Sequence, residues 1–284
     1  MRAGQGTAGA GRGGVLVTGC SSGIGLDAAR HLRMRGWRVL ATCRDPADVA
    51  ARRAEGFESF RLDLADPGSV AEAVSQAMAN GPVQALVNNA AFAIPAAVED
   101  IPRDALRHLF ETNLFGTHDL TCRMIAAFRA QGGRATIVNI SSVLGLVALK
   151  WRGAYVASKF ALEGLTDSLR QEMADTEIRV VLIEPGPITS KFRENAQIQF
   201  ARWIDWEASP RAAQYGRTLI PRLYRTDARD RFELPAAAVS AVIAKAIEAR
   251  RPRPRYHVTV PTRMAATAKR LLGTRGLDWL TRRS

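Results

Sequence analysis

Residues 14–36 read GVLVTGCSSGIGLDAARHLRMRG, a short apolar run followed at once by a glycine-rich segment and a stretch with helical spacing. Residues 14–18 predict a buried strand, and the stretch that ends at Gly36 predicts a helix. The glycines permit a tight turn and close backbone approach, and a helix N-terminus offers amides and a positive dipole to a pyrophosphate. This order predicts the first unit of a dinucleotide-binding fold; a glycine-rich turn without a ligand is the alternative.

The alternation of apolar runs and helical stretches continues along the chain. Further strands are predicted over residues 38–42, 57–62, 84–87, 134–140, 178–183 and 256–260, and helices over 47–55, 67–79, 102–130, 155–174 and 236–250. Because no antiparallel hairpin signal interrupts this order, we expect an α/β fold: a single Rossmann-type, doubly wound parallel sheet with helices on both faces. Ligands of such sheets bind beyond the carboxyl ends of the strands.

The two ends of the chain differ in composition from this repeating part. Residues 1–13 lack the apolar core of a signal peptide, and we expect a disordered tail there. A single domain is expected over residues 14–262, followed by a basic amphipathic tail over 263–284. No run of the sequence approaches the roughly 18 consecutive apolar residues of a transmembrane helix.

Charge and composition narrow the classes of function. The formal net charge of +13 would suit nucleic acid, an anionic membrane surface or an anionic cofactor. Much of the excess lies over residues 250–283, and the sequence shows no zinc-finger spacing or recognition helix, so nucleic acid is not expected. Cys20, Cys43 and Cys122 are scattered and odd in number, which favours a reduced cytosolic protein. The four histidines form no ligand cluster, and no metal is expected.

A second informative stretch, SSVLGLVALKWRGAYVASK over residues 141–159, places Tyr155 and Lys159 four apart on a predicted helix. Residues at this spacing share a helix face. Free tyrosine titrates near pH ~10 and a nearby cation lowers its pKa, so the pair suits proton transfer at an alcohol oxygen. Ser142, after a predicted strand, would donate to that oxygen. A surface Tyr–Lys pair is the alternative, and the accompanying motifs argue against it.

The end of the second predicted strand bears on the choice of cofactor. An acidic residue there accepts a hydrogen bond from the ribose 2′-hydroxyl of NAD, whereas an arginine accommodates the 2′-phosphate of NADP. Arg44 comes first, and Asp45 stands one step further on, at the start of a turn. NADP is therefore favoured, and a solvated loop charge is the alternative for Arg44.

Two other pairs of residues are singled out by their position. Asn113 and Gly116 lie inside the predicted 102–130 helix, where both are locally unfavourable. Such a broken local rule is typical of a functional site. Asp63 and Leu64 follow the third predicted strand and are expected to face an adenine pocket.

Together these motifs resemble the short-chain dehydrogenase/reductase family, in its order and spacing from residue 14 to about 190. The matching positions are Thr18-Gly-x-x-x-Gly-Ile-Gly25, Asp63, Asn88-Asn-Ala90, Asn113, Ser142, Tyr155-x-x-x-Lys159 and Pro185-Gly186. Ala91 stands where the family usually has glycine, a mild departure. TGCSSGIGL and ATCRD look most like the 17β-hydroxysteroid and retinol dehydrogenase-like branch, and RPRPRYHVTVP resembles bacterial NADP-dependent aldehyde or carbonyl reductases.

The resemblance implies roles for these positions. Tyr155 would be the general acid/base, and Lys159 would lower its pKa and hold the nicotinamide ribose. Ser142 would orient the substrate oxygen, and Asn113 would hold a water of the proton relay. The implied cofactor contacts are Gly19, Ser21, Ser22, Gly23, Ile24, Gly25, Arg44, Asp63, Leu64, Asn89, Tyr155, Lys159, Pro185, Gly186, Ile188 and Thr189. Ser21 and Arg44 would contact the 2′-phosphate, and Ile188 and Thr189 the nicotinamide carboxamide.

In the family the region of about 190–234 is the substrate lid. Here it carries Phe192, Phe200, Trp203, Trp206 and Tyr215. Aromatic helices closing over a nicotinamide would suit a lipophilic carbonyl or alcohol; the alternative is that each ring packs on the core.

The basic tail leaves three alternatives open. It would lie on an anionic membrane surface with Trp279 at the boundary, fold over its own active site, or contact a sister subunit. The resemblance also implies a homodimer or homotetramer that pairs through the helices holding Asn113 and Tyr155.

The sequence thus predicts a cytoplasmic enzyme, membrane-peripheral if its tail binds lipid. It would be an NADP(H)-dependent oxidoreductase moving a hydride between nicotinamide C4 and the carbonyl or alcohol carbon of a lipophilic aldehyde, ketone, retinoid or steroid. An NAD-dependent steroid or retinol dehydrogenase is the nearest rival. A non-catalytic NADP-binding regulator is disfavoured, because nothing would keep Asn113, Ser142, Tyr155 and Lys159 together in a pure sensor.

Overall fold

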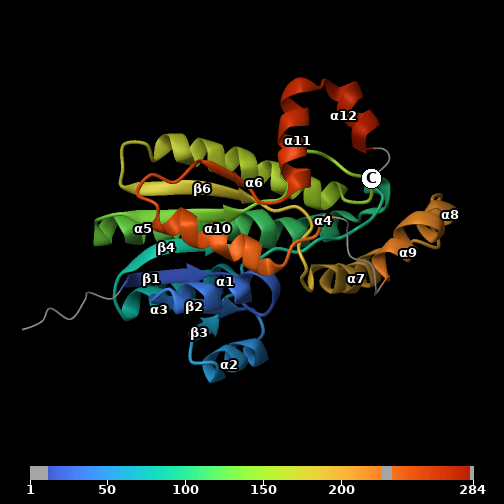
Figure 1. Cartoon of the computed structure of the whole chain (residues 1–284). Coiled ribbons are helices and arrows are strands. Elements are labelled where there is room, and N and C mark those ends of the chain that lie inside the picture. The colour runs from blue at the N-terminus through green and yellow to red at the C-terminus, as the bar shows by residue number, and fades with distance from the viewer. Residues whose placement is uncertain (1–11, 226–231, 282–284) are drawn as a thin grey trace, which may run out of the picture.

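The computed structural model describes residues 12–225 and 232–281, and these residues form one parallel sheet covered by helices (Figure 1). The sheet of the described residues has seven strands in the order β3-β2-β1-β4-β5-β6-β7, and every neighbouring pair is parallel. The strands are β1 (Arg12–Val17), β2 (Trp37–Cys43), β3 (Glu58–Arg61), β4 (Val83–Asn88), β5 (Ala135–Ile140), β6 (Ile178–Glu184) and β7 (Arg255–His257). The predicted doubly wound α/β fold is confirmed.

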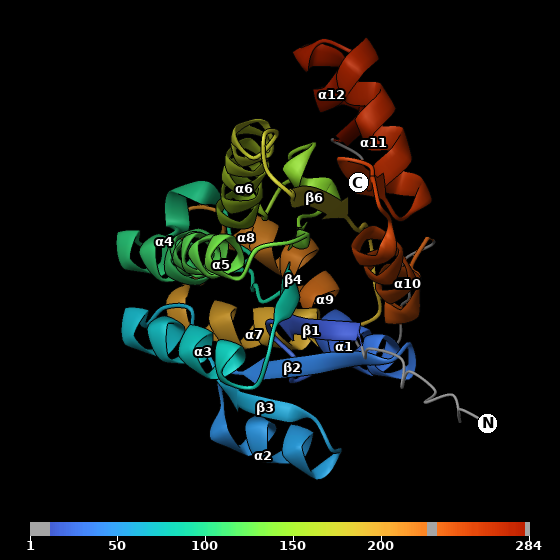
Figure 2. The ribbon, with the colours of Figure 1, turned by 90° about the vertical axis from the view of Figure 1, so that its left-hand side faces the viewer.

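Helices cover both faces of the sheet, as Figure 2 shows when the molecule is turned. The principal ones are α1 (Gly23–Met34), α2 (Pro46–Ala54), α3 (Pro67–Ala79), α4 (Arg103–Phe110), α5 (Thr117–Gln131), α6 (Gly153–Glu172) and α10 (Ala236–Glu248). The apolar residues of α1 and α10 pack with alternate strand residues in one core layer, and those of α3 and α5 pack with the other strand residues in a second layer. Strands buried on both faces explain the continuous apolar runs in the sequence.

Most predicted elements lie where the sequence placed them, and α3 has the predicted bounds. The predicted 102–130 helix is not uniform: the π-helix η2 (Glu111–Gly116) separates α4 from α5. The first strand begins at Arg12, so Arg12 and Gly13 belong to β1 rather than to the predicted tail, whose other residues lie outside the described part. The last predicted strand ends at His257, because Thr259 caps a helix by accepting a hydrogen bond from the Thr262 amide.

Two groups of helices extend from the body of the molecule (Figure 1). The predicted lid region contains α7 (Phe192–Trp203), α8 (Ala212–Gln214), η4 (Tyr215–Leu219) and α9 (Ile220–Leu223), and its residues 226–231 lie outside the described part. The predicted tail forms α11 (Val260–Leu271) and α12 (Thr274–Thr281). Short 3-10 turns occur at η1 (Val98–Asp100) and η3 (Val143–Gly145). None of the described helices combines the length and the apolar character that crossing a membrane requires.

Candidate active site

The carboxyl ends of the parallel strands meet at one edge of the sheet, and polar segments follow them there. Thr18 follows β1, Arg44 follows β2, Asn89 follows β4, Ser141 and Ser142 follow β5, and Pro185 follows β6. Asp63 comes soon after β3. The topology therefore brings the predicted site residues to a single edge, because strands that run in the same direction end on the same side.

The glycine turn between β1 and α1 needs its glycines. Gly19 and Gly23 have φ of 73° and 55°, in the left-handed region that side chains disfavour. A Cβ at Gly25 would lie 2.2 Å from the Gly19 carbonyl oxygen. Helix α1 begins at Gly23, and the side chain of its N-cap residue, Ser22, makes no capping hydrogen bond. The turn therefore leaves amide groups at a helix N-terminus without a side-chain cap, which suits a phosphate.

Thr18 and Asn89 fasten this turn to the end of β4. The Thr18 hydroxyl accepts hydrogen bonds of 2.9 Å from the amides of Asn89 and Ala90. The Asn89 side chain donates to the Thr18 carbonyl oxygen at 2.9 Å. The resemblance implied that Asn89 contacts the cofactor, and its side-chain amide here donates to the glycine turn instead. The quoted motif contains Thr18, but sequence reasoning assigned it no role.

At the end of β2, the two competing residues have different surroundings. Asp45 is the N-cap of α2, and its Oδ1 accepts a hydrogen bond of 2.8 Å from the Ala47 amide. Arg44 is exposed. Burial lowers the pKa of the His108 imidazole, and the charges of Arg202 and, to a smaller extent, Arg44 lower it further. The arginine is thus the side chain at this strand end that is available to an anion.

Asp63 and Leu64 are less accessible to a cofactor than expected, because both make contacts within the protein. The Asp63 carboxylate accepts from the Ala65 amide at 3.1 Å and lies 3.4 Å from the Arg61 guanidinium. Leu64 is buried in the core layer of α3 and α5. Its carbonyl oxygen lies 1.8 Å from the point where a Cβ on Gly116 would stand, so Gly116 permits η2 to approach the end of β3.

The three predicted catalytic side chains come together between β5 and α6. Tyr155 and Lys159 lie in the first two turns of α6 and are 7 % and 3 % exposed. The Lys159 Nζ donates a hydrogen bond of 2.8 Å to the Ile140 carbonyl oxygen and lies 5.5 Å from the centroid of the Tyr155 ring. The Ser142 hydroxyl accepts from the Leu144 amide at 3.1 Å and is a hydrogen-bonding neighbour of Tyr155.

Burial controls the electrostatics of this trio. Burial raises the pKa of Tyr155, and the Ser142 hydroxyl opposes that rise. Burial lowers the pKa of Lys159 to about 8, and the Glu163 carboxylate opposes that fall. The predicted lowering of the Tyr155 pKa by Lys159 is therefore not the direction found here. Desolvation of the phenolate is the largest cause, and the hydrogen bond of the Lys159 ammonium is directed to the Ile140 carbonyl.

Asn113 is buried within η2 and has its side chain fully engaged. Its Nδ2 donates to the Phe92 carbonyl oxygen at 2.9 Å and to the Ser158 hydroxyl at 3.2 Å, and its Oδ1 accepts from the Phe92 amide at 3.1 Å. The Ser158 hydroxyl in turn donates to the Tyr155 carbonyl oxygen at 2.8 Å. Asn113, the residue that is unfavourable in an ordinary helix, thus lies in a π-helical turn and links α6 to the loop after β4. The link to α6 is made through Ser158, whose role the sequence did not reveal.

The segment after β6 is tied to the lid and to the C-terminal region. The Pro185 carbonyl oxygen accepts from the Val143 amide at 2.7 Å, beside Ser142. A Cβ on Gly186 would lie 2.1 Å from the Thr259 hydroxyl oxygen. Ile188 packs against the α1 and α10 layer, while the Thr189 hydroxyl donates to Glu233 at 2.6 Å. These residues therefore form the chain segment that connects β6 to the lid.

The aromatic residues of the lid divide into two groups. Phe200 and Tyr215 are buried and form an apolar cluster that Trp203 and Trp206 pack against, as the packing alternative expected. Phe192 differs, because its ring meets the Tyr155 ring edge-on with centroids 5.3 Å apart. One lid aromatic therefore lies directly against the predicted catalytic tyrosine.

Comparison with known proteins agrees with this geometry. A family model described as short chain dehydrogenase matches residues 14–199. The chain belongs to the short-chain dehydrogenase family. Uncharacterized oxidoreductase YbbO of Escherichia coli is 38 % identical over 267 residues, which cover 93 % of this chain and 92 % of that protein. 17-beta-hydroxysteroid dehydrogenase type 6 of Rattus norvegicus is 32 % identical over 253 residues, covering 85 % of this chain and 79 % of that protein.

Solved structures of other short-chain dehydrogenases have the same fold. An actinorhodin polyketide ketoreductase with NADPH is similar with a TM-score of 0.70 and 27 % identity, covering 87 % of this chain and 95 % of that one. A short-chain dehydrogenase/reductase from Burkholderia phymatum, solved with NAD, has a TM-score of 0.77 over 96 % of both chains; at 22 % identity it supports the fold alone. This short-chain dehydrogenase is thus an oxidoreductase of the retinol and steroid dehydrogenase-like branch, and its glycine turn and uncapped α1 fit a nicotinamide dinucleotide.

Proposed function

We propose that this short-chain dehydrogenase uses NADP(H) to interconvert a lipophilic carbonyl compound and its alcohol. The observation that carries the proposal is the meeting of Ser142, Tyr155 and Lys159 at the sheet edge that also holds the glycine turn. The bound nicotinamide would supply or accept the hydride. The chain's own residues would hold the substrate oxygen and move its proton.

Each of the three side chains has a distinct part. The Tyr155 hydroxyl would give its proton to the developing alkoxide in reduction, or take one from the alcohol in oxidation. The Ser142 hydroxyl, fixed by its bond to the Leu144 amide, would orient the same oxygen. A cation at Lys159 favours the tyrosinate, and its ammonium would also hold the nicotinamide ribose. Because the Asn113 side chain is fully engaged, we assign the contact with a relay water to its backbone carbonyl.

The preference for NADP rests on the end of β2. Asp45, the residue that would accept the ribose hydroxyl of NAD, caps α2 instead. Arg44 is exposed, and among the described residues it has no hydrogen-bonded partner. Ser21, exposed in the glycine turn, is the second candidate contact for the 2′-phosphate. A guanidinium and a hydroxyl suit a phosphate because both donate to its oxygens.

The proposed substrate is lipophilic. Phe192 places an apolar ring against Tyr155, and the lid behind it is built on the Phe200 and Tyr215 cluster. Two relatives carry names that fit such a substrate, retinol dehydrogenase 16 of Mus musculus and 17-beta-hydroxysteroid dehydrogenase type 6 of Rattus norvegicus. We propose an aldehyde, ketone, retinoid or steroid on these grounds.

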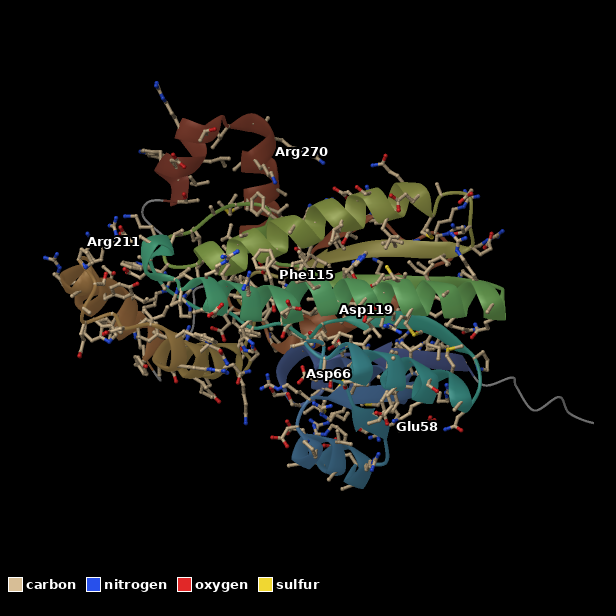
Figure 3. All side chains as sticks on the ribbon, turned by 180° about the vertical axis from the view of Figure 1, so that it is seen from behind. Glu58, Asp66, Phe115, Asp119, Arg211 and Arg270 are labelled. Atoms are coloured by element: carbon tan, nitrogen blue, oxygen red, sulfur yellow. The ribbon has the colours of Figure 1, made fainter. Side chains whose placement is uncertain are left out.

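Pairing between subunits would use the face of α4, η2 and α6. Leu106, Phe115 and Leu165 on these elements are 38 %, 51 % and 44 % exposed. Figure 3 shows Phe115 and Asp119 on the outward side of η2 and α5. Exposed apolar side chains on the helices that hold the site support a homodimer or homotetramer.

The C-terminal helices support two of the alternatives for the tail. Ala265 of α11 packs with Leu146 and Val147, close to the loop between Ser142 and Tyr155, so the tail covers part of the site's surroundings. Other apolar side chains of these helices point outward, including Leu271 and Trp279, which are 77 % and 65 % exposed. Arg270 lies on the same protruding helix pair (Figure 3). Exposed apolar and basic side chains together suit an anionic membrane surface, and the free cysteines suit a cytoplasmic location.

The test measures the oxidation of the reduced cofactor in the presence of a panel of aldehydes and ketones, from short aliphatic compounds to retinal and a 17-ketosteroid. Each substrate is offered with NADPH and with NADH. The proposal predicts turnover with NADPH that rises toward the lipophilic members. Turnover with NADH alone would mean that the cofactor is NAD and not NADP. Tight NADPH binding without any turnover would favour a cofactor-binding regulator.

A further inference from the structure

Helix α6 carries a third ionisable residue in line with the catalytic pair. Tyr155, Lys159 and Glu163 follow one another at intervals of four, so they lie on one face of the helix. The Glu163 side chain is 9 % exposed, and it faces inward. A carboxylate in such a place is costly unless a cation meets it, so its partners must explain why it is retained.

Arg255, on the last strand, supplies that cation. Its guanidinium forms an ion pair with Glu163, a second with Glu184 at 2.5 Å and a third with Asp167 at 2.6 Å. Residue Arg255 is in register with Leu182 of β6, which places it beside Glu184 at the end of that strand. A chain segment close to the C-terminus therefore fixes the carboxylate that lies one turn beyond Lys159.

The charges around Lys159 and Glu163 come from several elements. Lys159 faces Tyr155 and Glu163 on its own helix and the Ile140 carbonyl from β5. Glu163 faces Ser141 after β5, Glu184 of β6 and Arg255 of β7. Glu184 also contacts the His257 ring, and Asp167 pairs with Arg170. Among these groups, the Glu163 carboxylate lies one helical turn from Lys159 on the same face of α6, and its charge opposes the effect of burial on the pKa of Lys159.

The direction of that action follows from the burial of both groups. Burial lowers the pKa of Lys159 to about 8, and the Glu163 carboxylate pulls it back upward. Burial and Glu184 raise the pKa of Glu163 itself, while Ser141 and Arg255 lower it. The net effect raises the pKa of Glu163, and the Arg255 ion pair opposes that rise; to the extent that Glu163 is ionised, its charge favours a protonated Lys159.

We propose that Glu163, held by Arg255, is a positioning residue that keeps the buried Lys159 side chain in its ammonium form beside Tyr155. It would thereby set the alkaline end of the pH range in which the enzyme works. The effect on the pH range rests on the proposed function, because it assumes that Tyr155 and Lys159 carry the reaction. The titration of Lys159 itself needs neither substrate nor cofactor.

The titration of Lys159 can be read directly. The lysines of the chain are Lys150, Lys159, Lys191, Lys245 and Lys269, so the NMR spectrum of protein labelled with 13C at lysine Cε has few signals, and Lys159→Met identifies the relevant one. In Glu163→Gln the transition of that signal should move to lower pH by about 1 unit, which corresponds to a roughly tenfold weaker proton affinity. Glu172→Gln, on the exposed end of the same helix, should leave it in place.

One further variant keeps the test decisive. Glu163→Asp retains the charge and should restore most of the wild-type transition. If Glu163→Gln does not fold, the proposal is tested with Glu163→Asp, in which the Lys159 transition should move to lower pH by a smaller amount. An unchanged Lys159 transition in folded Glu163→Gln would overturn the proposal. With a substrate in hand, the alkaline limb of kcat should move with the NMR transition, while cofactor KM measured at a pH well below both Lys159 transitions stays unchanged; movement of the NMR transition without any turnover would instead count against the proposed function.

Discussion

The Lys159 ammonium donates a hydrogen bond of 2.8 Å to the carbonyl oxygen of Ile140, the last residue of β5. This bond joins the second turn of α6 to the strand end from which Ser142 follows. Because Tyr155 lies one turn before Lys159, the same bond fixes how the tyrosine stands relative to the serine. The cation therefore acts on the geometry of the site as well as on its charge.

Arg44→Asp should reverse the preference for cofactor. The substitution removes the guanidinium that would meet the 2′-phosphate and places a carboxylate there, so KM for NADPH should rise about 10- to 100-fold, the effect of losing a charge-assisted contact of roughly 1.5–3 kcal/mol. KM for NADH should fall or stay the same. Steady-state kinetics with both cofactors measure this.

Arg251→Asp is the matched control, because it makes the same charge change on the exposed segment before β7, at the opposite edge of the sheet. An Arg44→Asp enzyme that prefers NADPH as strongly as the wild type would remove the basis for the NADP assignment.

Gly116→Ala should destabilise the protein, because the new Cβ would meet the Leu64 carbonyl oxygen at 1.8 Å and backbone would have to move. A loss of about 2 kcal/mol or more is expected. Gly164→Ala, in the exposed middle of α6 with nothing within 4 Å of its Cβ, should instead stabilise by roughly 0.5–1 kcal/mol. Urea unfolding measures both. Equal effects of the two substitutions would show that η2 does not approach β3 so closely.

Tyr215→Phe should loosen the lid. The Tyr215 hydroxyl donates to Asp100 at 2.7 Å and accepts from the Ala97 amide at 2.8 Å, so its removal takes this partner from a half-buried carboxylate, which keeps its bond from the Ser209 hydroxyl, and from a half-buried amide. The cost should be about 0.5–1.5 kcal/mol in the free energy of unfolding. Tyr224→Phe, at a side chain that is 46 % exposed, is the control and should have little effect. A Tyr215→Phe protein as stable as that control would contradict the packing described for the lid.

Glu248 should contribute stability that acid removes. Arg35, Trp37 and Arg12 meet its carboxylate and lower its pKa from 4.5 to about 2. A carboxylate with a lowered pKa in the folded state stabilises fully above the unfolded value and loses that contribution as pH falls from about 4.5 through about 2. Glu248→Gln should therefore lower Tm near neutral pH, and the difference from wild type should shrink in acid.

Scanning calorimetry across this pH range tests the prediction about Glu248. Glu177→Gln, whose side chain is 68 % exposed, provides the comparison. A Tm difference between wild type and Glu248→Gln that does not change with pH would mean that the ion pairs at the ends of α1 and α10 add no stability.

The sequence was most informative where local patterns decide structure. The period of apolar residues predicted α3 with its correct bounds, and Pro67 at its start explains why, since proline favours a first helical turn. Asn113 was singled out because it breaks a helical rule, and it lies in a π-helix. What the sequence did not reveal depends on contacts between distant segments. The Arg255 and Glu163 ion pair exists only because β7 lies beside β6, and the Ser158 bond to Asn113 only because α6 packs on η2. The pKa of Tyr155 depends on burial, which spacing alone does not give.

In the proposed reaction Tyr155 moves the proton while hydride passes between nicotinamide C4 and a carbonyl carbon. The most direct test of this reaction follows the deuterium of C4-deuterated NADPH into the alcohol product, with wild type and with Tyr155→Phe. Deuterium is expected on the carbinol carbon of the wild-type product, and the rate of product formation should be lower by about 10²- to 10⁴-fold in Tyr155→Phe, with NADPH binding retained. Undiminished deuterium transfer by Tyr155→Phe would show that Tyr155 does not move the proton.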